Sequence, residues 1–70
     1  MIDEAAAKAL VEAHLTQIGE PGWSYVIRGA KRHQDCWAIA VKPYNVDGQP
    51  AYGVMGFEVD VASGAVTQWL

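Results

Sequence analysis

Cysteine and basic residues are scarce in this 70-residue chain. Its single cysteine, Cys36, excludes an internal disulfide and fits a reducing compartment. Five Lys and Arg residues against eight Asp and Glu give a net charge of -3, which argues against a nucleic-acid partner because phosphate binding needs clustered cations. No apolar run approaches the roughly 20 residues that cross a bilayer, and the acidic pair Asp3 and Glu4 is unlike the start of a signal peptide. We therefore expect a cytoplasmic protein that binds neither nucleic acid nor membrane.

The chain also lacks the motifs of common enzymes and metal sites. It contains no GxSxG elbow, phosphate-binding glycine loop, dinucleotide fingerprint or paired CxxC motif. His33 and Cys36 alone fall short of the four ligands of a structural zinc site, and an enzymatic role for this pair is the last of our hypotheses. Glu58 and Asp60 share a strand face that we expect to be solvated, and His14 lies on an apolar helix face. We expect no catalysis, cofactor or metal.

The first third of the chain predicts one amphipathic helix. Asp3 is a suitable N-cap, Glu4 favours the positive end of the helix dipole, and Gly19 and Pro21 end the element near Ile18. Glu4, Lys8 and Glu12 recur every four residues and are expected to form a solvated, ion-paired face. The opposite, apolar side is expected to lie on a sheet, and it consists of Ala6, Ala7, Leu10, Val11, Ala13, His14 and Ile18.

Alternating residues and turn formers predict four strands after the helix. The expected strands are 23–29, 36–42, 51–61 and 65–70, with irregular connections at 30–35 and 44–50. Gly53 and Gly56 indicate a bulge, Cys36 is expected to be a partly buried core thiol, and Gly64 should adopt a left-handed conformation in the closing turn. Successive strands without intervening helices favour an antiparallel meander. Residues 1–70 are thus expected to form a single α+β domain, one N-terminal helix packed on a four-stranded antiparallel meander sheet.

Exposed aromatic and charged side chains are the candidates for binding a partner, because Tyr, Trp and Arg carry much of the energy of interfaces. A basic cluster is expected at the tip of the first hairpin, two tyrosines flank the long turn, and Trp69 falls on the face opposite Val66 and Leu70. A solvated hairpin tip and rings that merely cover sheet surface are the alternatives. The candidate contacts are Arg28, Lys31, Arg32, Tyr44, Asn45, Asp47, Tyr52, Glu58, Asp60 and Trp69.

Two segments carry a family resemblance. With the N-terminal helix, the strand Cys36-Trp37-Ala38-Ile39-Ala40-Val41 and the hairpin Val59-Asp60-Val61-Ala62-Ser63-Gly64-Ala65-Val66 resemble the YrhB-like proteins of bacterial toxin-immunity type. That resemblance implies a helix followed by a meander, and a non-catalytic protein that binds a toxin enzyme or an unfolded client. The hairpin also resembles the PepSY domain, which implies a protease-associated or inhibitory module, usually outside the cytoplasm. Neither family pattern assigns a functional residue to this sequence.

The leading hypothesis is therefore a small binding protein of immunity or inhibitor type that covers the surface of a partner protein. The second hypothesis is a structural module that self-associates, since an unpaired edge strand is a template for pairing with another copy. A homodimer through an exposed sheet edge would be its result.

Overall fold

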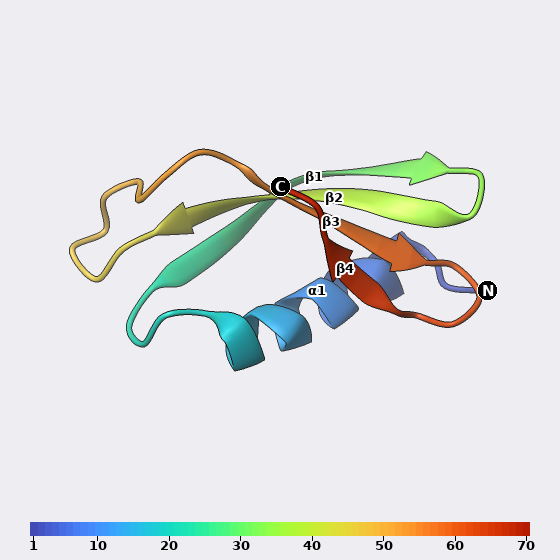
Figure 1. The fold of residues 1–70 in the computed structure, drawn as a ribbon, viewed down its shortest axis with the longest axis horizontal. Helices are drawn as coiled ribbons and strands as arrows, with labels where there is room; N and C mark the ends of the chain where they lie inside the picture. The colour runs from blue at the N-terminus through green and yellow to red at the C-terminus, as the bar shows by residue number, and fades with distance from the viewer.

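The computed structural model describes residues 1–70 as one helix followed by four strands. The strands form a single antiparallel sheet in the sequential order β1-β2-β3-β4, and α1 lies across one of its faces (Figure 1). The predicted α+β fold, a helix packed on a four-stranded meander, is confirmed. The elements are α1 Glu4–Ile18, β1 Ser24–His33, β2 Cys36–Tyr44, β3 Met55–Asp60 and β4 Val66–Gln68.

Both ends of α1 follow from local chemistry. The Asp3 carboxylate accepts a hydrogen bond from the backbone N–H of Ala6 at 2.9 Å, as an N-cap does. Lys8 pairs with Glu4 at 2.8 Å on the solvated side of the helix. At the other end, a Cβ on Gly19 would lie 2.6 Å from the carbonyl oxygen of Leu15, so only glycine fits there without a shift. The helix is too short and too polar to cross a membrane.

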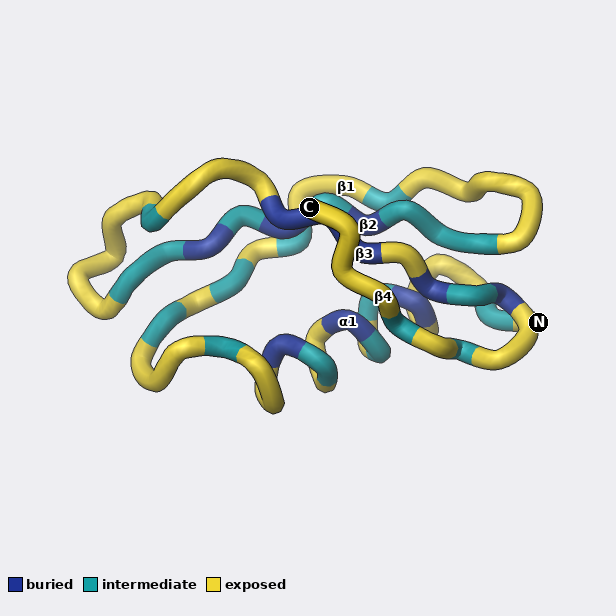
Figure 2. The backbone as a smooth tube through the Cα atoms, in the orientation of Figure 1, coloured by how far each residue is buried: buried dark blue, intermediate teal, exposed yellow.

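The core lies between α1 and the face of the sheet that α1 covers (Figure 2). Its centre is the fully buried ring of Phe57, against which His14 packs edge-on with ring centroids 5.8 Å apart. The helix contributes a narrower apolar stripe than predicted, since Ala6, Ala13 and Ile18 are exposed. Leu15, which was not predicted on this side, is buried. The core cluster is Ala7, Val11, Leu15, Ile39, Val41, Met55, Phe57 and Val59.

The first hairpin is longer than the sequence suggested. Residues 30–35 were expected to connect two strands, but β1 continues to His33 and only Gln34 and Asp35 form the turn. This prediction is wrong because the outer half of β1 is a polar strand at the edge of the sheet. Its sequence does not alternate between apolar and polar residues, and the strand is held by its pairing with β2. The bulge also lies elsewhere than predicted, at Arg28 between β1 and β2, while the register of β2 with β3 is unbroken past Gly56.

The segment between β2 and β3 is an irregular loop that projects beyond the sheet (Figure 1). Residues 51–54 were predicted as part of the third strand, but β3 begins only at Met55. The backbone of this segment has other partners: Ala51 donates to the Pro43 carbonyl oxygen at 3.2 Å, and the carbonyl of Tyr52 accepts from Lys42 Nζ at 2.9 Å. These bonds, with the isolated bridge between Tyr44 and Pro50, tie the segment to the end of β2, outside the ladder of β2 with β3.

The closing hairpin has the predicted turn and a shorter final strand. Gly64 has φ 78°, the expected left-handed conformation, and β4 covers only Val66–Gln68 instead of residues 65–70. Beyond β4 the chain still follows β3, because the N–H of Trp69 donates to the Gly56 carbonyl at 2.9 Å and that of Gly56 to the Leu70 carbonyl at 3.0 Å.

Candidate functional site

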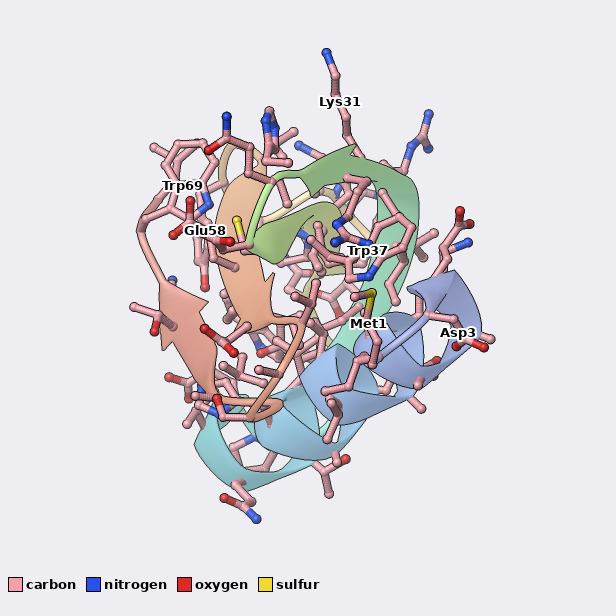
Figure 3. All side chains as sticks on the ribbon, turned by 90° about the vertical axis from the view of Figure 1, so that its right-hand side faces the viewer. Met1, Asp3, Lys31, Trp37, Glu58 and Trp69 are labelled. Carbon is pink, nitrogen blue, oxygen red and sulfur yellow. The ribbon has the colours of Figure 1, made fainter.

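One face of the sheet has no helix over it, and we call it the open face. Side chains alternate along each strand, so the residues between the core positions of β1, β2 and β3 point away from α1. Figure 3 shows Lys31 and Trp69 on the side of the sheet remote from the helix. The open face consists of Gly29, Lys31, His33, Cys36, Ala38, Ala40, Gly56, Glu58, Asp60, Thr67, Trp69 and Leu70.

The register of the sheet arranges charge on this face in columns. Lys31 pairs with Ala38, which pairs with Glu58 on its other side, so a cation and an acid flank a small residue in one row. In the next row, His33 and Asp60 lie on either side of Cys36. We call Lys31 and His33 on β1 the basic column, and Glu58 and Asp60 on β3 the acidic column. Neighbouring strands lie about 4.8 Å apart, so the two columns are separated by about 10 Å. The single ion pair of the structure joins Lys8 and Glu4, so neither Lys31 nor Glu58 is neutralised within the chain.

An apolar groove of about 400 Å³ crosses the open face, and eight of its twelve lining residues are hydrophobic. Its floor is made of small residues, among them Gly29, Ala40 and Gly56, which form a single row. The indole of Trp69 lies over Gly56, where an added Cβ would come within 2.6 Å of the ring. Trp69 nevertheless remains 58% exposed, because nothing covers the outer side of the ring.

An acidic hollow of about 360 Å³ adjoins Glu58 and Asp60 at the turn end of the open face. Burial raises the pKa of the Cys36 thiol, and the neighbouring carboxylates of Glu58, Asp35 and Asp60 raise it further. Such a thiol is a poor nucleophile at neutral pH, since the thiolate is the reactive form. Cys36 is partly buried, as predicted, but it lies on the open face and outside the core cluster.

The carboxylate of Asp60 has a structural task in the closing turn. Its Oδ1 accepts hydrogen bonds from the backbone N–H groups of Ala62 and Ser63, both at 2.8 Å. The Ser63 N–H and then the Ala62 N–H lower the pKa of this carboxyl below its usual value. Glu58 has no such bond and is exposed, so it is the more available acid of the pair.

The predicted basic cluster is divided by the fold. Arg28 occupies the bulge, Lys31 and His33 face the open side, and Arg32 points to the other side of the sheet. The Arg32 guanidinium lies 5.8 Å from the centre of the Trp37 ring and donates to the carbonyl of Gln34 at 3.0 Å. Because Lys31 and Arg32 are neighbours in a strand and not in a loop tip, they cannot contact one surface together.

The predicted contacts in the long loop lie at the opposite end of the molecule from the closing hairpin (Figure 1). Asn45 holds the loop together, since its Oδ1 accepts from the backbone N–H of Asp47 at 3.0 Å and of Gln49 at 3.1 Å. Asp47 is exposed, Tyr44 is half-buried, and the exposed ring of Tyr52 packs 5.8 Å from that of Trp23. The structure thus gathers Lys31, Glu58, Asp60 and Trp69 on the open face and leaves the loop residues apart from them.

Another hollow, of about 460 Å³, lies between the end of α1 and the start of β1. Its lining includes Glu12, Glu20, Trp23 and Tyr25, but only three of its eight lining residues are hydrophobic. No three His, Cys, Asp or Glu side chains are grouped where they could share a metal ion. The open face, with its apolar groove and its charged columns, is therefore the better-defined candidate site.

The floor of the groove was missed by sequence reasoning, which sought large and charged side chains. A signal for it exists in the alternation of β2, where Cys36, Ala38 and Ala40 occupy every second position opposite bulky core residues. Comparison with known proteins adds no relative: no protein-family model, curated protein or solved structure matches this chain.

Proposed function

We propose that this chain is a small non-catalytic protein-binding domain of immunity or inhibitor type, which neutralises or shields a partner by covering part of its surface. The observation that carries the proposal is the open face, where an apolar groove with an exposed Trp69 adjoins the basic residues of β1 and the acidic residues of β3. An exposed apolar patch with a charged rim is typical of an interface, and Trp is prominent among residues that dominate binding energy.

The chemistry of the same face supports binding and not catalysis. The raised pKa of Cys36 keeps its thiol protonated at neutral pH. The lowered pKa of Asp60 keeps that carboxyl ionised, so it is no general acid at neutral pH.

The proposed partner is another protein, and a toxin enzyme fits the resemblance to YrhB-like immunity proteins. We place the protein in a bacterial cytoplasm, which is supported by that resemblance and by the lone cysteine. A PepSY-like inhibitory module, associated with a protease, is the alternative within the same class of function.

The test is the capture of a partner by the tagged chain co-expressed with the products of neighbouring genes. Ala38→Arg places a long cation in the middle of the open face, and Ala9→Arg makes the same change on the exposed side of α1. The wild type and Ala9→Arg should capture the same protein, while Ala38→Arg should reduce capture about tenfold or more, a loss of at least 1.4 kcal/mol.

Three outcomes would contradict this proposal. Ala38→Arg and Ala9→Arg could bind the partner equally well, which would place the contact elsewhere. Ala9→Arg alone could abolish binding, which would assign it to the helix. The chain could also capture none of these proteins and give no protection against a co-encoded toxin.

Self-association through a sheet edge is a second candidate, because β1 is a ten-residue strand at the edge of the sheet. An unpaired edge of this length is a template for another strand. The bulge at Arg28 and the positive charge of Lys31 oppose such pairing, since bulges and lysines are common ways to protect an edge. Sedimentation at high micromolar concentration tests it, and a strict monomer would remove it.

A further inference from the structure

We propose that the open face also binds a second copy of this chain, in a face-to-face dimer whose two-fold axis runs along β2. The inference rests on the proposed function in assigning binding to the open face. It identifies one molecule that binds the open face, a second copy of the chain. A dimer closed over this face would compete with the partner protein.

The charge columns are self-complementary under that symmetry. A two-fold axis parallel to β2 places β1 of each copy over β3 of the other. Each row of paired residues then lies opposite the same row of the second copy. Lys31 of each copy then faces Glu58 of the other, because the two residues share a row with Ala38 between them. His33 and Asp60 meet in the same way. Each contact forms twice, as an isologous interface requires.

The shape of the groove fits the same arrangement. Trp69 lies over Gly56 on the β3 side of β2, and Gly29 is in the same row on the β1 side. A Cβ placed on Gly29 would have nothing within 4 Å, so the space above it is empty. The two-fold axis brings the indole of each copy over the empty site of the other, while Ala38 and Ala40 near the axis allow the sheets to approach closely.

The size of the contact indicates a weak dimer. Three strands spaced about 4.8 Å apart, with a rise of about 3.3 Å per residue over the six residues of β3, give a footprint on the order of 300 Å² per copy. A standard protein interface buries about 800 Å² per partner. We therefore expect association at high micromolar concentration and a largely monomeric protein at low concentration, so that a tightly binding partner can displace the second copy.

Charge exchange measured by sedimentation tests the pairing of Lys31 with Glu58. Lys31→Glu and Glu58→Lys should each weaken self-association about tenfold or more, because each places like charges opposite one another twice. The double variant should regain most of the wild-type association. An equimolar mixture of the two single variants should form a mixed dimer, in which every charge again meets its opposite.

Filling the empty site tests the shape with a matched control. Gly29 and Gly53 both have open space at the Cβ position and neither has a positive φ, so valine is tolerated by the monomer at each. Gly29→Val should abolish self-association, whereas Gly53→Val, in the loop, should associate as the wild type does. Circular dichroism and thermal melting of each variant establish that it is folded.

The proposal is overturned if the wild type stays monomeric at high micromolar concentration, or if self-association survives both Gly29→Val and the charge exchanges. The second result would assign association to the β1 edge. Failure of the dimer proposal can be distinguished from failure of the proposed function. A monomer whose partner capture is lost in Ala38→Arg leaves the proposed function standing, and a dimer that captures no partner removes the proposed function alone.

Discussion

Phe57 and Glu58 are neighbours on β3 that point to opposite faces of the sheet, so truncating each one tests which face holds the core. Phe57 has no exposed surface and packs against the His14 ring, whereas Glu58 is exposed. Phe57→Ala should cost about 3–5 kcal/mol, the usual range for a buried phenylalanine. A domain of 70 residues has only about 3.5–10 kcal/mol in total, at roughly 0.05–0.15 per residue. Phe57→Ala should therefore bring the domain close to unfolding, and Glu58→Ala should change its stability by less than about 0.5 kcal/mol.

Urea unfolding followed by circular dichroism measures these differences, and Phe57→Leu provides an intermediate variant that stays folded. Its expected loss is below about 1.5 kcal/mol, because leucine keeps most of the buried volume. Each kcal/mol lost from the free energy of unfolding should lower the melting temperature by about 4–8 °C in a domain of this size. The reasoning would be refuted if Glu58→Ala destabilised the domain as much as Phe57→Leu, or if Phe57→Ala cost less than about 1 kcal/mol.

Three further predictions concern the helix cap, the N-terminal segment and the closing turn. Asp3→Ala should cost about 1 kcal/mol through the lost N-cap, measured by thermal melting against Asp3→Asn, which keeps the acceptor. Trp37→Phe should cost about 1 kcal/mol and speed amide exchange near Ile2, whose carbonyl accepts from the indole at 2.9 Å. Because the pKa of Asp60 is lowered in the folded state, its stabilisation is complete above the unfolded value of about 3.9 and is lost as the pH falls through the lower folded pKa. Unfolding of the wild type and of Asp60→Asn between pH 2 and 6 checks this, and a variant that keeps the full acid-induced loss would contradict it.

Much of the fold follows from short-range sequence signals. The Asp3 cap, the alanine-rich helix and the alternation around Phe57 each indicated the element that the structure contains. The sequence of the outer half of β1 did not indicate a strand, because an exposed polar edge strand has no apolar alternation. This part of β1 is held by its pairing with β2. The bulge at Arg28 lies beside Gly29, a residue type that often marks a bulge, but the strand was predicted to end at this glycine.

The candidate site was only partly predictable, since a surface depends on which strands are neighbours. Trp69 and Glu58 were identified from residue type and alternation, and the structure exposes both. Arg32 was grouped with Lys31 because the two are adjacent in sequence, yet the strand turns them to opposite faces. The empty space above Gly29 depends on the register of β1 with β2, which the sequence alone does not specify.

The most direct test of the claim that the open face binds proteins is a series of ¹H–¹⁵N spectra of the labelled chain. They would be recorded from low to high micromolar concentration and then with the captured partner added. The account predicts that the amide signals of Ala38, Ala40 and Gly56 and the indole N–H of Trp69 move in both series, while signals from the exposed side of α1 stay fixed. Shifts confined to α1 or to the free edge of β1, or no shift in either series, would contradict it.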